Sequence, residues 1–212
     1  MLRLQVGDAL DLFNGEGGEY RASLIAVDKH AARVRVAEFR AIERESPLAI
    51  TLALGISAGE RMDYSLQKAT ELGVTTIAPL ATERSVVKLA GDRADKRRRH
   101  WQNVVIAACE QCGRNRVPVI APVQALYSYL AQVDRSARLL LLSPDAASPL
   151  KRMKPSAAVV LLVGAEGGFS QSEQEAAQAN AFEAVNLGPR ILRTETAPVA
   201  ALAALQTLWG DL

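Results

Sequence analysis

One stretch, residues 159–170, constrains the fold of this chain more than any other. The run Val159–Val163 consists only of valine and leucine, which predicts a strand buried on both faces, as in a parallel sheet covered by helices. Three glycines follow within residues 164–168, and Ser170–Glu173 has the spacing of a capping box, which predicts a helix start. Ligands of open α/β sheets bind beyond the carboxyl ends of the strands. The turn is therefore either one wall of a small-molecule site or a tight turn without a ligand.

The spacing of these glycines excludes two common phosphate-binding motifs. The pattern G-x-x-G-G matches neither the dinucleotide fingerprint G-x-G-x-x-G nor a P-loop, which ends in Gly-Lys-Ser/Thr. Glu166 lies inside the turn, and its negative charge disfavours a polyphosphate. A cationic or neutral ligand suits the turn better.

A second polar stretch, Leu187–Ala197, has the composition of a binding loop. It carries two arginines, a glutamate and two threonines around the apolar pair Ile191-Leu192. A turn followed by an N-cap at Thr194 or Thr196 would explain it structurally. Taken together with the glycine turn, the stretch favours a ligand pocket between two neighbouring strand ends.

The hydrophobic pattern divides the chain near Glu43–Pro47. Residues 1–45 read as short strands separated by turns and predict a small barrel or curled sheet, with strands at Asp8–Phe13, Glu19–Val27 and Ala32–Phe39. Residues 46–212 alternate between strand and helix patterns and predict an α/β domain. Its strands are expected at 48–56, 74–79, 138–142, 159–163 and 184–187, with a short extended piece at 117–122. Its helices are expected at 61–72, 92–113, 125–133, 170–180 and 196–209.

Charge is uneven along a chain whose net charge is only +2. Between Lys88 and Arg116 there are eight basic and three acidic residues, a pattern typical of nucleic-acid binding but also of a solvated helix face.

Cys109 and Cys112 are the two cysteines. They lie late in an expected helix with no second pair to complete a zinc site, so we expect helix packing and no metal.

Nothing in the sequence predicts a membrane segment. There is no apolar run near the roughly 18 residues that can span a bilayer. Arg3, Asp8 and Asp11 interrupt the N-terminal region, which argues against a signal peptide. We therefore expect a soluble, cytoplasmic protein.

Four ordered motifs lie between Gln67 and Ala197. Two of them are Leu162–Ser170 and Leu187–Ala197. The others are Gln67–Gly73 with Thr82–Ser85, and Ala108–Arg114 with Pro118. Together they resemble the RsmE family, ribosomal RNA small-subunit uridine-N3 methyltransferases of the SPOUT class. Ala165 and Cys112 differ from the residues that are usual in the family. The chain also opens partway into the family's first domain, so the resemblance implies an N-terminally shortened barrel.

The resemblance implies a fold, a cofactor and an assembly. The fold is a PUA-like β-barrel RNA-binding domain over residues 1–45, then a SPOUT domain over residues 46–212 with a mostly parallel sheet and a C-terminal deep trefoil knot. The cofactor is S-adenosylmethionine and the assembly a homodimer. Family resemblance places the cofactor contacts at Leu162, Gly164, Glu166, Gly167, Gly168, Leu187, Gly188, Ile191, Leu192, Arg193, Thr196 and Ala197.

The implied reaction is methyl transfer to N3 of a uridine in 16S rRNA, in the free RNA or the small ribosomal subunit. Arg193 is the candidate for stabilising a uracil oxygen, and Glu195 is a weaker candidate for the base. The RNA is expected to contact Arg84, Lys88, Arg97, Arg98, Arg114 and Arg116. Two alternatives stay open: a non-catalytic RNA-binding protein with the same fold, and a knotted methyltransferase acting on tRNA.

Overall fold

The computed structural model describes residues 4–87, 89 and 91–212. Contacts divide the chain into two compact units. The first comprises Met1–Glu45 together with Cys109–Val117, and the second comprises Ser46–Ala108 together with Pro118–Leu212. The segment 109–117, which the sequence analysis assigned to the α/β domain, therefore groups by its contacts with the first unit.

The described part of the first unit contains a three-stranded antiparallel sheet in the order β1-β2-β3. Its strands are β1 (Ala9–Leu12), β2 (Glu19–Val27) and β3 (Ala32–Arg40), close to the predicted ranges. Ala22 and Leu24 of β2 are buried, and β2 pairs with β3 through two register irregularities. Such irregularities increase the local twist of a sheet.

Polar contacts attach the segment 109–117 to the residues that follow β3. Arg114 forms an ion pair with Glu45, and Arg116 Nε lies 2.7 Å from a Glu43 carboxylate oxygen. Asn115 Nδ2 donates to the Ile42 carbonyl at 2.7 Å. Local sequence patterns carry no signal for these contacts, because the partners are about seventy residues apart along the chain.

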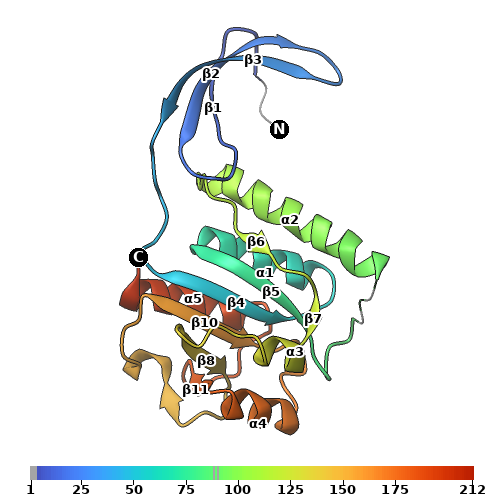
Figure 1. Cartoon of the computed structure of the whole chain (residues 1–212), viewed down its shortest axis with the longest axis vertical. Helices are drawn as coiled ribbons and strands as arrows, with labels where there is room; N and C mark the ends of the chain where they lie inside the picture. Colours follow the sequence, from blue (N-terminus) through green and yellow to red (C-terminus); the bar gives the residue numbers. More distant parts are fainter. Residues whose placement is uncertain (1–3, 88, 90) are drawn as a thin grey trace. The chain divides into compact units, whose positions relative to one another are not determined.

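The second unit is built on an eight-stranded sheet in which every pairing between described strands is parallel. The order is β6-β5-β4-β10-β8-β11-β9, with β7 also paired to β5. The strands are β4 (Ala49–Gly55), β5 (Val74–Ala81), β6 (Val119–Ile120), β7 (Gln124–Ala125), β8 (Arg138–Leu142), β9 (Ser148–Pro149), β10 (Ala158–Val163) and β11 (Glu183–Asn186). The prediction of a mostly parallel α/β sheet is confirmed (Figure 1).

Strand β10 lies in the middle of this sheet, between β4 and β8. Its residues Val159–Val163 are all buried, as the continuous apolar run predicts for a strand covered on both faces. Val160 and Leu162 belong to a core cluster with residues of α3 (Leu126–Leu130) and α4 (Gln171–Ala179). Because side chains alternate along a strand, Val159 and Leu161 face the opposite side.

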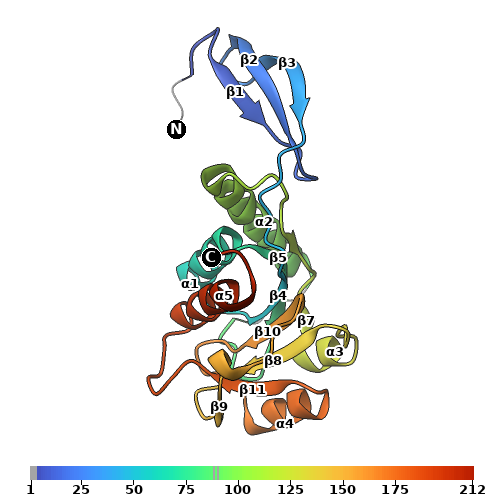
Figure 2. The ribbon, with the colours of Figure 1, turned by 90° about the vertical axis from the view of Figure 1, so that its left-hand side faces the viewer.

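Helices cover the sheet on both sides. α1 (Glu60–Glu71) packs against α5 (Thr196–Trp209), and α3 packs against α4. Figure 2 shows α1 and α5 on one side of the sheet and α3 on the other. The remaining helices are α2 (Asp92–Cys112) and the single-turn η1 (Leu150–Arg152). Among the described helices, none is long and apolar enough to cross a membrane.

Element boundaries differ from prediction mainly where the elements are short. The helix expected at 125–133 spans only Leu126–Leu130, and the short extended piece expected at 117–122 contains the two-residue strand Val119–Ile120. β7, β9 and η1 were not predicted. A two-residue strand carries no periodic pattern, so sequence reasoning has no signal for it.

Candidate functional site

A cavity of about 310 Å³ opens at the carboxyl ends of β8, β10 and β11. Each strand contributes the segment that follows it as one wall. The first wall is residues 163–169 after β10, the second wall is residues 187–197 after β11, and the third wall is residues 142–145 after β8. Arg84, from the loop after β5, and Gln174 of α4 complete the lining.

The first wall is held in shape by close backbone contacts. A Cβ atom on Gly164 would lie 2.9 Å from the Cα and carbonyl carbon of Gly168, so only glycine fits at that position. Gly168 has a φ of +65°, a conformation that glycine adopts without strain, and its N–H donates to the Ala165 carbonyl at 2.9 Å. Behind the wall, a Cβ on Gly55 would lie 2.5 Å from the Ala165 nitrogen.

The predicted capping box begins α4 immediately after this wall. The Ser170 hydroxyl accepts from the Glu173 N–H at 3.1 Å, and the Glu173 carboxylate accepts from the Ser170 N–H at 2.9 Å. The second Glu173 oxygen accepts from the Glu83 N–H at 2.8 Å. Glu173, only 1% exposed, therefore attaches the loop after β5 to the start of α4.

The second wall is more open and is held by longer hydrogen bonds. The Thr194 hydroxyl lies 3.4 Å from the Gly164 carbonyl and 3.3 Å from the Ser57 hydroxyl. Asn186 Oδ1 accepts from the Gly188 N–H at 3.0 Å. Ile191 lines the cavity although it is 85% exposed, so this wall packs loosely.

Glu166 carries the main negative charge of the first wall. Burial by itself raises its pKa, but hydrogen bonds from backbone N–H groups, chiefly that of Ala58 at 2.9 Å, and from Arg61 at 3.4 Å outweigh it, and the net pKa is lowered. These bonds engage Oε1, while Oε2 is buried without a hydrogen-bond partner among the described residues. The site therefore presents a fixed carboxylate that can stabilise a cationic ligand.

Comparison with known proteins shows to which family this chain belongs. Residues 44–206 match the family described as the RNA methyltransferase domain, and residues 2–37 match the RNA methyltransferase PUA domain. The chain is 36% identical over 213 residues to the ribosomal RNA small subunit methyltransferase E of Buchnera aphidicola from Schizaphis graminum, covering 100% of this chain and 87% of the relative. The chain belongs to the ribosomal RNA small subunit methyltransferase E family.

Solved structures agree with this membership. A methyltransferase E from Neisseria gonorrhoeae bound to S-adenosylmethionine is 46% identical, with a TM-score of 0.95, over 99% of this chain and 87% of that one. A methyltransferase from Legionella pneumophila in complex with the same cofactor is 42% identical, with a TM-score of 0.94, over 99% and 87% of the two chains.

The structure brings most of the family's expected cofactor residues to one cavity. Those that line it are Gly164, Glu166, Gly167, Gly168, Leu187, Gly188, Ile191, Leu192 and Ala197. Three others are not among the lining residues. The Leu162 side chain is fully buried in the core, and Arg193 and Thr196 are exposed at the start of α5, where the Arg193 carbonyl accepts from the Thr196 N–H at 3.0 Å.

The third wall was missed by sequence reasoning. Ser143 and Asp145 line it, and the Ser143 N–H donates to the Val185 carbonyl of β11 at 2.9 Å. The available signal was the end of the strand predicted at 138–142. It was not enough, because the order of strands in a sheet follows from packing and not from local pattern. Other lining residues that were missed are Leu142, Pro144, Val163, Ala165, Phe169, Gln174, Arg190 and Thr194.

The two predicted catalytic residues belong to the segment of the second wall but do not line the cavity, and their surroundings differ. Arg193 is exposed. The Glu195 carboxylate lies 4.0 Å from Arg61 Nε, and its side chain is 23% exposed. Arg61 therefore lies close to both Glu166 and Glu195, and sequence reasoning gave it no role.

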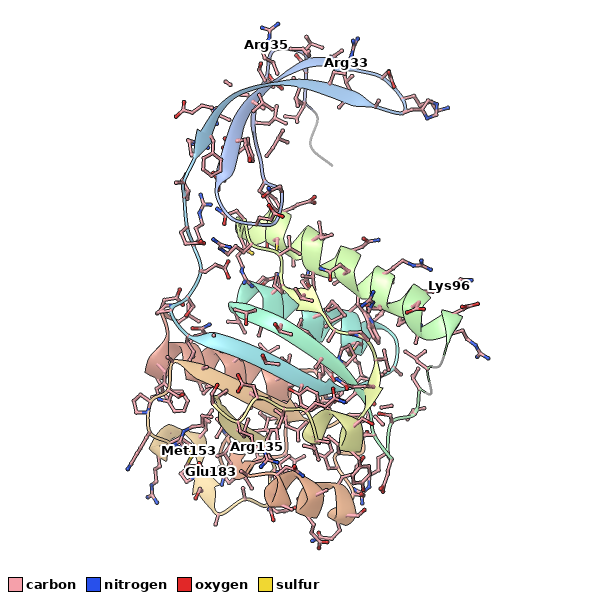
Figure 3. All side chains as sticks on the ribbon, viewed as in Figure 1. Arg33, Arg35, Lys96, Arg135, Met153 and Glu183 are labelled. Carbon is pink, nitrogen blue, oxygen red and sulfur yellow. The ribbon has the colours of Figure 1, made fainter. Side chains whose placement is uncertain are left out.

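The arginines expected to contact RNA fall into three environments. Arg97 and Arg98 lie on the basic half of α2, near the exposed Lys96 labelled in Figure 3. Arg84 lines the cavity. Arg114 and Arg116 are paired within the first unit; the Arg114 side chain is only 6% exposed, and the hydrogen bond to Glu43 raises the pKa of Arg116. Lys88 lies outside the described residues.

Cys109 has the environment expected of a packing residue, and Cys112 is half-buried. Cys109 is fully buried, and burial raises the pKa of its thiol to about 11, whereas reactive thiols have lowered values. Within the described ranges, no cluster of three His, Cys, Asp or Glu side chains is arranged to hold a metal ion.

Proposed function

We propose that this chain is an S-adenosylmethionine-dependent methyltransferase that methylates N3 of a uridine in 16S rRNA of the small ribosomal subunit. The observation that carries the proposal is the cavity between the ends of β8, β10 and β11, lined by nine of the residues expected from the family's cofactor motifs. The methyltransferase from Neisseria gonorrhoeae that binds this cofactor shares 46% of its residues with the chain.

The residues of the cavity fit this cofactor. Gly168 and Gly188 both have positive φ, and a Cβ at either position would meet no atom within 4 Å, so these glycines leave open space on two walls. The buried, unpartnered oxygen of Glu166 suits a positively charged group. When bound, the cofactor supplies an electrophilic methyl group on a sulfonium.

Methylation at N3 requires the loss of a proton from a neutral uracil ring. Glu195, on the segment after β11 that forms the second wall, is the proposed base, and its carboxylate lies 4.0 Å from Arg61 Nε. Arg193 is the proposed donor to a uracil oxygen, because it is exposed beside the second wall and donates hydrogen bonds without accepting them. Alignment of the two reactants in one cavity supplies much of the rate.

We further propose that residues 1–45 act as a PUA-like β-barrel that binds RNA and residues 46–212 as a SPOUT domain. Arg97 and Arg98 of α2, together with Lys88 and Arg116, are the proposed phosphate contacts. Arg33 and Arg35 add exposed positive charge on β3 (Figure 3). Arg114 is omitted because its side chain is only 6% exposed in its pair with Glu45, whereas that of Arg116 is 53% exposed. Binding through phosphates gives an affinity that falls steeply with salt.

A deep trefoil knot and a homodimer complete the proposal. Support for the knot comes from the chain path, because the segment after β11 returns to place Thr194 against the Gly164 carbonyl at the end of β10. Leu208 on α5 and Ile191 on the second wall are exposed and are the proposed dimer contacts. A substrate in the small ribosomal subunit makes the proposed location cytoplasmic.

Nucleoside mass spectrometry tests the proposal directly. The purified chain is incubated with S-adenosylmethionine and with 16S rRNA, assembled small subunits or tRNA. We expect N3-methyluridine only in the ribosomal RNA or subunit. Methylation of tRNA alone would assign a different substrate, and rRNA binding with no cofactor binding by calorimetry would indicate a non-catalytic RNA-binding protein.

A further inference from the structure

Arg84 lines the cavity, although the sequence grouped it with the basic residues expected to contact RNA. It comes from the loop Thr82–Ser85 after β5 and lines the same cavity as the glycine turn. The described structure records no ion pair for it, whereas Arg61, Arg114 and Arg116 each lie beside a carboxylate. Arg84 therefore places a guanidinium at a ligand cavity with no salt bridge recorded in the described part of the chain, and its charge interaction is electrostatic, with the carboxylate of the adjacent Glu83.

The loop that carries Arg84 is held on several sides. The Thr82 and Ser85 hydroxyls lie 2.8 Å apart, and both residues are buried. The Glu83 N–H donates to the buried Glu173 carboxylate at 2.8 Å. The Glu83 carboxylate also accepts from the Tyr127 hydroxyl at 3.1 Å. These contacts fix the backbone on both sides of Arg84.

The Arg84 side chain lies across the first wall. Arg84 Nη1 donates to the Gly167 carbonyl at 2.9 Å. A Cβ on Gly167 would lie 2.9 Å from the Arg84 Cβ and 3.3 Å from its Cδ, so the absence of a side chain at Gly167 lets the arginine stem rest on the turn. A guanidinium has five N–H donors in a planar fork, and this single bond leaves the others available to a ligand.

We propose that Arg84 binds the α-carboxylate of S-adenosylmethionine and thereby selects a cofactor with an intact amino acid end. The inference rests on the proposed function, because it concerns the same cavity. The cofactor carries one anionic group, the carboxylate, and two cationic groups, the ammonium and the sulfonium. The cavity has matching charges, with guanidinium groups at Arg84 and Arg190 and carboxylates at Glu166 and Asp145.

The anchoring of Arg84 distinguishes it from Arg190. Arg190 is exposed on the loosely packed second wall, and the described contacts include no hydrogen bond from its side chain. Arg84 is held by its loop and by Gly167, so less side-chain entropy is lost when it binds a carboxylate. Charge-assisted bonds from a fork of N–H groups are stronger than neutral ones.

Calorimetry with two ligands isolates the carboxylate. The full-length chain is titrated with S-adenosylmethionine and with its decarboxylated form, which differs only in lacking that group. We expect the unmodified chain to prefer S-adenosylmethionine by roughly 10- to 100-fold. Arg84→Gln is expected to remove this preference and leave the affinity for the decarboxylated form within about twofold, while Arg84→Lys retains part of it.

Two control variants and an RNA measurement make the test decisive. Arg135→Gln, at the amino end of β8 (Figure 3), is expected to keep the full preference, and Arg190→Gln most of it. The inference would be overturned if Arg84→Gln lost affinity equally for both ligands. It would also be overturned if Arg190→Gln, and not Arg84→Gln, lost the preference for S-adenosylmethionine. Unchanged cofactor affinity with weaker binding to 16S rRNA would overturn it as well and would assign Arg84 to RNA. An unmodified chain that binds neither ligand would refute the proposed function itself.

Discussion

The first and second walls of the cavity are built in different ways. The first wall contains buried Ala165 and Phe169, and its backbone passes so close to its neighbours that Gly55 and Gly164 admit no side chain. The second wall contains exposed Ile191 and is joined to the first by a 3.4 Å hydrogen bond from the Thr194 hydroxyl to the Gly164 carbonyl, while the same hydroxyl lies 3.3 Å from that of Ser57.

This difference separates stability from binding. Changes at the first wall disturb packing that exists before any ligand arrives, and therefore lower the free energy of unfolding. Changes at the second wall remove few packed contacts, so they act mainly on ligand affinity.

The same substitution, made behind the first wall at Gly55 and on the second wall at Gly188, is expected to give the largest contrast in stability. Gly55→Ala places a Cβ 2.5 Å from the Ala165 nitrogen, and backbone cannot move aside as a flexible side chain can. We expect it to lower the unfolding free energy by about 3 kcal/mol. Gly188→Ala meets no atom within 4 Å and has only the backbone strain of its positive φ, about 1 kcal/mol. Urea denaturation measures both, and equal losses would contradict the comparison.

Glu173→Gln is expected to have the next largest effect. Both carboxylate oxygens accept backbone N–H bonds, from Ser170 and from Glu83. An amide presents a donor to one of those N–H groups, and a buried N–H left without an acceptor costs about 2 kcal/mol. Glu175→Gln on the exposed side of α4 is the matched control and should change stability by less than about 0.5 kcal/mol. If Glu175→Gln lowers the free energy of unfolding as much as Glu173→Gln does, the anchoring role of Glu173 is wrong.

Thr194→Val is expected to affect binding more than folding. The valine keeps the shape of threonine but removes the hydroxyl that joins the two walls. We expect the unfolding free energy to fall by less than about 1 kcal/mol and S-adenosylmethionine affinity to fall roughly 3- to 10-fold. Thr194→Ser keeps the hydroxyl and should bind nearly as the unmodified chain does. A stability loss as large as that of Gly55→Ala would remove the distinction between the walls.

The pH dependence of Glu166 is expected to give the smallest effect under ordinary conditions. Its pKa is lower in the folded chain than in the unfolded chain, as its N–H bonds outweigh burial. Its contribution to stability is therefore complete above the unfolded pKa and is lost as pH falls through the lower folded value. Cofactor affinity should fall in the same acidic window, while Glu166→Gln should bind more weakly at pH 7 and lack this dependence. Calorimetry at pH values above acid unfolding measures the cofactor affinity of both proteins. Identical pH profiles for the unmodified chain and Glu166→Gln would contradict the role given to Glu166.

Local chemistry predicted the first wall well. Val159–Val163 was expected to be a doubly covered strand, and Ser170 with Glu173 was expected to start a helix; both are confirmed. These features depend on neighbouring residues, so a short window of sequence contains the information that they need. The start of α5 at Thr196 was predicted for the same reason.

Contacts between distant residues account for what sequence reasoning missed. Arg84 was grouped with the basic residues of 88–116, yet it lies on Gly167, eighty-three residues away along the chain. Arg114 was read as a surface cation, but Glu45 compensates its charge in a buried pair. A run of charged residues does not show which side chains will form ion pairs, because their partners are brought close only by the tertiary fold.

The sequence alone determined the elements that form the cavity and the kind of charge that it accepts. The buried strand, the glycine turn with Glu166 and the polar stretch Leu187–Ala197 are all local patterns. Only the tertiary structure decided that β8, β10 and β11 end side by side, that residues 142–145 form a third wall and that Arg84 joins the site. The reason is physical: backbone conformation follows from near neighbours, whereas the order of strands follows from burying the apolar faces of the whole sheet at once.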